Sequence, residues 1–322
     1  PVALFDYAGN LRGEPVRLPV TQQINGYLID GPIAFAEARR SPLSPALPAV
    51  MFGSMANDGG HFFVGPEEYH QLVADPIVAK YLRPFVGARE LIHGTDRWCL
   101  WLADADPSDI SRSPTIKERV EAVRALRAAS NRAATRALAD TPHLFGERRH
   151  RDVTHLAIPR HVSETRRYWT VQLVGPETIV GDANFMVEDP DGFAFGVISS
   201  AAFIAWQRAV GGRIKSDLRF SSTLTWNTLP LPELTDRARA GIIAAGGSVL
   251  AARGLHPHRS LADHYNPLAM TPELLRAHRE LDSAVDKALG LRGQVTGDAR
   301  LRGLFANYTK LTTADELAMP KK

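Results

Sequence analysis

Charged and apolar residues alternate in the segment from Arg213 to Arg219, which reads Arg-Ile-Lys-Ser-Asp-Leu-Arg. In an extended strand alternate side chains lie on one face, so this pattern predicts a face shared by Arg213, Lys215, Asp217 and Arg219. Arginine and lysine pair with the O6 and N7 acceptors of guanine, and a carboxylate accepts a hydrogen bond from N4 of cytosine. The segment is therefore a candidate for reading DNA bases. The alternative interpretation is an exposed strand edge with a local ion pair.

Basic residues gather in the middle of the chain. Residues 112–167 contain 13 Lys and Arg against 6 Asp and Glu, a surplus that suits contact with DNA phosphates. Two groups of cations are candidate phosphate contacts, one on a face of a predicted helix and one in a loop before a predicted strand. They are Lys117, Arg124, Arg132 and Arg136, and then Arg160, Arg166 and Arg167. Solvated helix faces and loops are the alternative interpretation.

A turn signal from Asn57 to His61, Asn-Asp-Gly-Gly-His, supplies two weaker candidates. Its glycines can provide the positive φ that a tight hairpin turn needs. A plain turn is the preferred interpretation. Asn57 and His61 are kept as weak candidates for contact with a base or a phosphate.

The sequence lacks the common short motifs of nucleotide binding and catalysis. The sequence contains no G-x-G-x-x-G or G-x-x-x-x-G-K-[ST] motif, and no H-E-x-x-H or G-x-S-x-G motif. Asn266 is followed by one proline and then Leu268, so the Asn-Pro-Pro-aromatic tetrapeptide of amino-methylating DNA methyltransferases is absent. The pair His256 and His258 lacks spaced partners, and Cys99 is the single cysteine. We predict no catalytic residue and no metal site, and interpret the chain as a binding module.

Length and composition indicate a globular protein of about two domains. The chain has 322 residues, of which 44% are hydrophobic and 23% charged. No apolar run approaches the ~20 residues that cross a bilayer, and the first residues lack the pattern of a signal peptide. We therefore expect no membrane association and a cytoplasmic location.

Hydrophobic periodicity predicts an α+β protein. Helices are predicted over 66–72, 113–139 and 198–210, and strands over 97–102, 155–158, 168–173, 178–180 and 213–226. After two closely spaced prolines, three amphipathic helices are predicted over 236–252, 272–289 and 298–308. The fold class is thus a mixed β-sheet domain with helices, followed by an all-α C-terminal domain. Residues 1–24 are expected to form a connecting arm rather than part of a core.

Longer strings carry a family resemblance. They occur in order along most of the chain and include Ile24–Leu28, Val50–His61, Arg83–Glu90, Gly212–Ser221, Trp226–Pro232 and Leu281–Asp286. Together these strings resemble the target-recognition domain and the C-terminal helical domain of the MmeI-like DNA methyltransferases.

The resemblance implies a function that the chain performs with other domains. Residues 25–234 would be a DNA target-recognition domain and residues 235–322 a helical C-terminal domain, serving an adenine-N6 methyltransferase of a restriction–modification system. In this family the methyltransferase domain lies upstream and binds S-adenosylmethionine, so the chain is expected to be a fragment or a separate subunit that is not catalytic by itself. The expected partners are double-stranded DNA and that upstream catalytic domain, from which residues 1–24 would form the connecting arm. The alternative is a protein-interaction subunit of a larger complex that does not read DNA.

Overall fold

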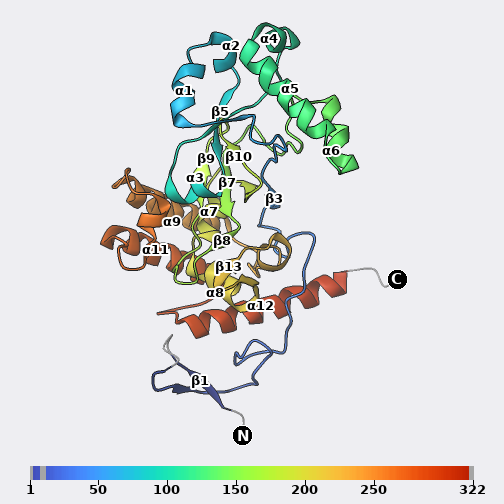
Figure 1. The fold of residues 1–322 in the computed structure, drawn as a ribbon. Helices are drawn as coiled ribbons and strands as arrows, with labels where there is room; N and C mark the ends of the chain where they lie inside the picture. The colour runs from blue at the N-terminus through green and yellow to red at the C-terminus, as the bar shows by residue number, and fades with distance from the viewer. Residues whose placement is uncertain (1–2, 8–11, 319–322) are drawn as a thin grey trace.

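The computed structural model describes residues 3–7 and 12–318. The predicted α+β class is confirmed, because sheets and helices mix before residue 235 and the described chain beyond it is helical (Figure 1). Residues 1–2 and 8–11 of the predicted arm, and residues 319–322 of the predicted C-terminal domain, lie outside the described residues. The described part of the arm forms an antiparallel hairpin of β1 (Leu4–Asp6) and β2 (Val16–Leu18).

A central antiparallel sheet has the strand order β3-β11-β7-β9. Its strands are β3 (Met51–Phe52), β7 (His155–Pro159), β9 (Gln172–Val174) and β11 (Asn184–Glu188). β7 is buried along its whole length, as expected of a strand covered on both faces. The helices α7 (Phe193–Ile198) and α8 (Ala201–Val210) continue the chain from this sheet.

The C-terminal helices share the core of the central sheet. They are α9 (Asp236–Gly254), α10 (Leu261–His264), α11 (Pro272–Ala288) and α12 (Gly297–Ala318). One cluster of buried apolar side chains extends from Ile29 to Tyr308 and includes residues of both parts. α7 and α9 come close because Gly196 lacks a side chain, and a Cβ there would lie 2.7 Å from Cγ2 of Ile242.

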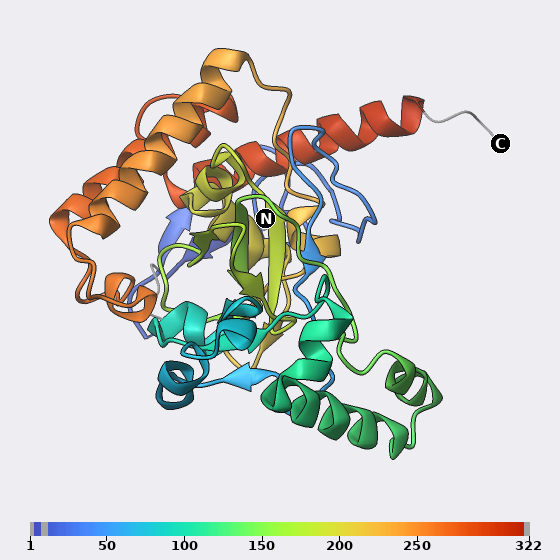
Figure 2. The same cartoon turned by 90° about the horizontal axis from the view of Figure 1, so that it is seen from above.

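A second body, here called the small lobe (residues 56–145 and 179–180), has its own apolar core. Its sheet has the order β10-β5-β6-β4, with β4 (Phe63–Val64), β5 (Leu82–Val86), β6 (Trp98–Leu100) and β10 (Ile179–Val180). Its helices are α1 (Pro66–Leu72), α2 (Pro76–Ala79), α3 (Ala88–His93), α4 (Pro107–Arg112), α5 (Pro114–Ala128) and α6 (Ala133–Ala137). α5 and α6 lie at the opposite side of the molecule from α9 and α11 (Figures 1 and 2).

A small three-stranded sheet completes the fold. It has the order β12-β13-β8 and consists of β8 (His161–Val162), β12 (Arg213–Ile214) and β13 (Asp217–Arg219). A five-residue π-helical turn, Ser222–Trp226, follows it.

Four predicted elements are wrong in detail. The strand predicted over 213–226 ends at Arg219, and Ser222–Trp226 form a π-helical turn, in which the Ser221 hydroxyl accepts from the Leu224 N–H at 3.0 Å. The helix over 113–139 is interrupted, because α5 ends at Ala128 and α6 starts only at Ala133. Ser130 lies in the break and its hydroxyl accepts a hydrogen bond from the Arg132 N–H at 3.2 Å, a local bond that competes with helix. The strand predicted over 168–173 is confined to β9, and the helix over 198–210 is divided between α7 and α8.

The segment before β9 is not a strand because its polar groups bind the C-terminal helices. The Tyr168 hydroxyl donates to Oδ2 of Asp282 at 3.0 Å, and Nη1 of Arg253 donates to the Val171 carbonyl at 2.8 Å. The Ala201 N–H donates to Oδ1 of Asp282 at 2.7 Å. Asp282 therefore joins α11 both to α8 and to the segment that leads into the central sheet.

Replacing Asp282 by Asn should remove a pH dependence of stability. Burial raises the pKa of Asp282 to about 6, against about 3.9 in an unfolded chain. The folded state then holds the proton more tightly, so the stability that this proton contributes is present at low pH and lost as the pH rises through 6. Relative to the variant, the parent's free energy of unfolding should fall by up to about 3 kcal/mol between pH 4 and pH 7. Urea unfolding at several pH values measures this difference, and parallel pH curves would contradict the assignment.

Candidate nucleic-acid interface

The segment from Arg213 to Arg219 is a hairpin and not a single extended strand. Ile214 pairs with Asp217 and Arg213 with Leu218, so Lys215 and Ser216 form a two-residue turn. Lys215 adopts a φ of 54°, the left-handed conformation that such turns require. The predicted common face of the four charged residues is therefore wrong, because the chain reverses direction at Lys215.

Cross-strand pairing shows which side chains do share a face. Residues directly opposite each other in an antiparallel pair point to the same side, so Asp217 lies beside Ile214, and Arg213 points to the side of Leu218. β8 extends the sheet and places His161 opposite Arg219. Four exposed residues make up what we call the hairpin face: Ile214, Asp217, Arg219 and His161. The opposite side carries the buried Leu218 and Val162.

His161 was not identified from the sequence, because its place beside Arg219 depends on pairing between strands far apart in the chain. Partial burial lowers the pKa of His161, and the Arg160 and Arg219 guanidiniums lower it further, while Asp217 opposes this shift. The imidazole is thus held toward its neutral form, in which one ring nitrogen donates and the other accepts a hydrogen bond. The hairpin face therefore combines an acidic, a basic, a neutral polar and an apolar side chain.

Three other predicted contact arginines, one in β12 and two in the loop after β8, have different surroundings. Arg213 donates to Oε2 of Glu164 at 3.3 Å and to the Ser216 carbonyl at 3.1 Å. Nη1 of Arg166 donates to two carbonyls of α10, those of Leu261 and Ala262, both at 3.2 Å. Arg166 therefore joins the hairpin region to the C-terminal helices, while Arg167 is exposed.

The four cations predicted on one long helix are all exposed, but they belong to two helices. Lys117 and Arg124 lie on α5, with Arg124 3.3 Å from Glu121, whereas Arg132 caps α6 and Arg136 lies within it. Nη1 of Arg136 donates to the Ser130 carbonyl at 2.9 Å, across the break between the helices. The four cations therefore do not follow one continuous helix face, because the helix is interrupted between α5 and α6.

A buried arginine that the sequence analysis missed fixes the chain at this break. Arg127 has no exposed surface, and its guanidinium donates to five backbone carbonyls at 2.8 to 3.1 Å. The acceptors are Ala56, Asn57, Leu138, Thr141 and Leu144. Desolvation lowers the pKa of Arg127. One side chain thus satisfies the carbonyls of three chain segments around the end of α5. The helical period was a signal that could have identified it, because Arg127 continues the spacing of the buried Ile116, Val120 and Val123.

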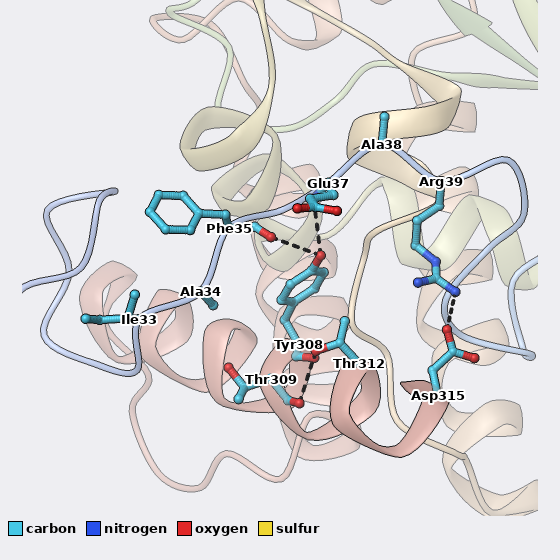
Figure 3. A pocket seen from close by; sticks show the side chains of 10 residues that line it. All are labelled: Ile33, Ala34, Phe35, Glu37, Ala38, Arg39, Tyr308, Thr309, Thr312 and Asp315. Atoms are coloured by element: carbon cyan, nitrogen blue, oxygen red, sulfur yellow. Dashed lines mark hydrogen bonds and ion pairs between the residues drawn. The ribbon is translucent and has the colours of Figure 1, made fainter. Parts of the chain in front are cut away.

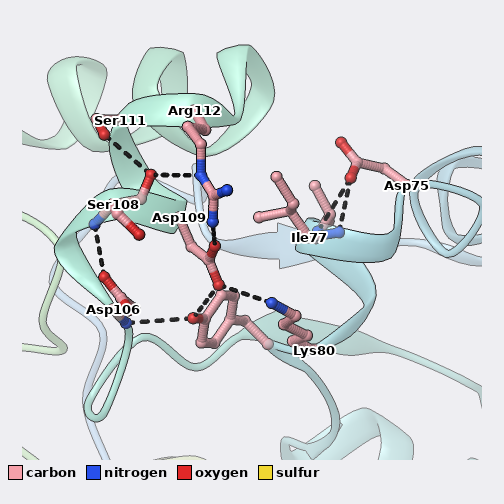
Figure 4. Close-up of polar contacts among 10 residues, drawn as sticks. Asp75, Ile77, Lys80, Asp106, Ser108, Asp109, Ser111 and Arg112 are labelled. Atoms are coloured by element: carbon pink, nitrogen blue, oxygen red, sulfur yellow. Dashed lines mark hydrogen bonds and ion pairs between the residues drawn. The ribbon is translucent and has the colours of Figure 1, made fainter.

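The start of α5 is held by a polar cluster around Asp109 (Figure 4). Oδ2 of Asp109 accepts from Nζ of Lys80 at 3.0 Å and from the Tyr81 hydroxyl at 2.9 Å, and Oδ1 accepts from Arg112 at 2.6 Å. The hydrogen bond from Lys80 lowers the pKa of Asp109 to about 2. Ser113 ends α4 and caps α5, so this cluster orients the helix that carries Lys117 and Arg124.

The segment from Asn57 to His61 is a turn. The Asp58 carboxylate accepts from the Gly60 and Phe62 N–H groups at 3.1 and 2.6 Å, and Asn57 adopts a φ of 50°. The Asn57 carbonyl belongs to the acceptors of Arg127, and the His61 carbonyl accepts from Arg119 at 2.6 Å. The backbone of both weak candidates thus supports the small lobe, while the His61 side chain is exposed.

A surface pocket of about 370 Å³ lies between residues 33–39 and α12 (Figure 3). Its polar groups bind one another: the Tyr308 hydroxyl donates to the Phe35 carbonyl at 3.2 Å, and Arg39 donates to Asp315 at 2.6 Å. These hydrogen bonds attach residues 35–39 to α12. Within the described residues, no three His, Cys, Asp or Glu side chains are placed to hold a metal ion, and no helix is long and apolar enough to cross a membrane.

Comparison with known families accounts for nearly the whole chain. The model of the MmeI target recognition domain matches residues 30–233, and the model of the MmeI C-terminal domain matches residues 234–316. The chain belongs to the MmeI family. DNA methyltransferase A of Bacillus subtilis (strain 168) is 33% identical over 294 residues, which cover 91% of this chain and 33% of that protein.

A solved structure of the type IIL restriction-modification enzyme MmeI in complex with DNA has a TM-score of 0.84 to this chain at 36% identity. The match covers 97% of this chain and 41% of that one. The chain therefore spans only a third to two-fifths of the length of these relatives.

Replacing Arg127 by Met should destabilise the protein by at least about 3 kcal/mol, because five buried carbonyls lose their donor. Urea unfolding gives the free energy. The matched control is Arg124→Met, one turn earlier on α5 and exposed, which should change stability by no more than about 0.5 kcal/mol. Equal effects of the two substitutions would show that the buried guanidinium does not support the lobe.

Proposed function

We propose that the chain is the module that recognises a DNA sequence for an adenine-N6 methyltransferase of a restriction–modification system. The observation that carries the proposal is the hairpin face, which lies on a chain of the MmeI family. A two-stranded β-ribbon can enter the major groove of B-DNA, and this ribbon ends in an exposed turn at Lys215. Its exposed side chains supply both donors and acceptors for base edges.

We assign base readout to Lys215, Asp217 and Arg219, joined by His161. Asp217 can accept from N4 of cytosine, and Lys215 or Arg219 can donate to O6 and N7 of guanine. Arg213 is tied to Glu164 and lies on the other side of the hairpin, so it is the weakest of the four predicted readout residues.

Phosphate contacts are assigned to the exposed cations of α5 and α6 and to Arg160 and Arg167. Such contacts supply affinity and fix the orientation of the protein without carrying sequence information. Arg166 is a weaker candidate because its guanidinium is bound to α10.

The catalytic half of the reaction is assigned to a methyltransferase domain outside this chain, in the same polypeptide or in a partner subunit. That domain would bind S-adenosylmethionine and carry out the methyl transfer. A DNA-modifying function of this kind also supports a cytoplasmic location. In this arrangement the chain itself binds the duplex and sets the site of modification.

The variant Arg124→Ala, Arg132→Ala, Arg136→Ala should bind all duplexes more weakly than the parent. The slope of log affinity against log salt should become less steep by up to ~3, about one unit for each lost phosphate contact. Fluorescence anisotropy at several salt concentrations measures the slope. The control removes three exposed cations of α11, at the opposite side of the molecule (Figure 1): Arg276, Arg279 and Lys287. An unchanged slope in the first variant would favour the alternative of a protein-interaction subunit.

Asp217→Asn should alter the preference at one base position while leaving non-specific affinity nearly unchanged. The substitution keeps the shape of the side chain but turns an acceptor into a group that also donates. A lost or mismatched contact should cost on the order of 1–3 kcal/mol at its own position. The test is run in the longer enzyme by sequencing the methylated sites of the variant and its parent. Asp104→Asn, an exposed aspartate of the small lobe, is the control. Identical methylated motifs would remove Asp217 from base readout.

A further inference from the structure

Phe52 is an exposed aromatic side chain at the edge of the central sheet. It ends β3, keeps 39% of its surface exposed, and stacks on Phe185 with ring centroids 4.3 Å apart. Phe185 in turn lies 5.0 Å from the ring of Phe220, which directly follows Arg219 of the hairpin face. A row of aromatic rings thus leads from the base of the hairpin to the surface, and Phe52 is its exposed end.

Two guanidiniums flank the Phe52 ring. Cζ of Arg160 lies 5.2 Å and Cζ of Arg149 lies 5.9 Å from the ring centroid. Arg149 is anchored, because it donates to the Gly53 carbonyl at 3.2 Å and pairs with Glu147. The Arg160 guanidinium, by contrast, has no hydrogen bond or ion pair with the part of the chain that the structure describes. Its charge is therefore available to an external group.

The backbone holds this cluster next to the hairpin face. Arg160 directly precedes His161, and its carbonyl accepts from the Phe220 N–H at 3.0 Å. On the other side, Gly53 follows Phe52 in a position that only glycine fits, since a Cβ there would lie 2.3 Å from the Gly181 carbonyl oxygen. Arg160 is thus fixed beside β8, the strand that pairs with β13, while Phe52 is fixed by the pairing of β3 with β11.

We propose that Phe52 and Arg160 form a further DNA contact, in which the Phe52 ring packs against a deoxyribose and Arg160 binds the adjoining phosphate. This inference rests on the proposed function and adds to it a residue that positions the duplex for the hairpin. The chemistry suits that ligand, since a sugar offers an apolar face within reach of a phosphate charge. A ring beside an unpaired guanidinium is a common combination in nucleic-acid binding. Arg149 acts indirectly by holding the strand that carries Phe52.

The experiment uses the longer enzyme that contains this chain. Phe52→Leu keeps an apolar side chain on Phe185 but removes the ring, and should weaken binding about 5-fold for specific and unrelated duplexes alike. Arg160→Gln should reduce the salt slope by about one unit. The double variant should lose less than the product of the two single losses, since the two contacts share one nucleotide. The methylated motif should stay the same. Arg279→Gln on α11 and Leu255→Ala, an exposed leucine after α9, are the controls.

Three results would overturn this proposal while leaving the proposed function untouched. Binding and salt slopes equal to those of the controls would show that the cluster does not touch DNA. A motif changed at one position by Phe52→Leu would assign the ring to base readout. Weaker binding accompanied by a matching loss of stability in urea would reduce Phe52 to a packing role.

The Arg124, Arg132 and Arg136 variant is measured in parallel, because an effect there with none at Phe52 and Arg160 leaves the proposed function standing. If the parent protein shows no salt-dependent DNA binding, both the proposed function and this further inference are overturned.

Discussion

The antiparallel pairing of β13 with β8 determines which side chains the molecule presents beside its hairpin. Leu218 opposite Val162 and Arg219 opposite His161 fix the register. A shift by one residue would turn Leu218 outward and bury Asp217 and Arg219. The burial of Leu218 and Val162 stabilises the observed register, because the shifted register would place charged side chains in an apolar core. The arrangement of the polar face is thus decided by apolar residues on the opposite face.

A comparable constraint positions the basic helices. The small lobe has its own core, so α5 is not held by the central sheet and needs attachments of its own. Asp109 provides one at the start of the helix and Arg127 provides another near its end. A buried guanidinium is costly to desolvate, and it is tolerated here because five carbonyls that would otherwise lack donors accept from it. The exposed cations between these two anchors lie on a helix with fixed ends.

The sequence predicted most elements because local signals decided them. Pro66, Pro114 and Pro272 lie in the first turns of α1, α5 and α11, and the helical C-terminal region follows its apolar periodicity. Local signals did not predict the hairpin, since Lys215 is an unusual residue at positive φ and no glycine or asparagine marks the turn. Nor did they show the break after α5, where the hydrogen bonds of Arg127 and Ser130 outweigh helix propensity. The function was predicted from the family resemblance, because hydrophobic periodicity indicates secondary structure and not function.

The residues of the site share a pattern that the sequence cannot reveal, because it depends on contacts distant in the chain. Helical spacing places Arg127 on the buried side of α5, but it does not show that its guanidinium binds carbonyls of other segments. Arg166 looks like its neighbour Arg167, yet Arg166 binds backbone carbonyls and Arg167 is exposed. Carbonyl acceptors decide which arginines support the fold and which remain available to a polyanion. The same division holds at the hairpin, where Leu218 and Val162 support the sheet while Asp217, Arg219 and His161 are exposed. Substitutions of exposed side chains away from buried networks usually change stability by no more than about 0.5 kcal/mol. The hairpin face can therefore vary in chemistry while its supports stay constant, which is what a module that distinguishes one DNA sequence from another requires.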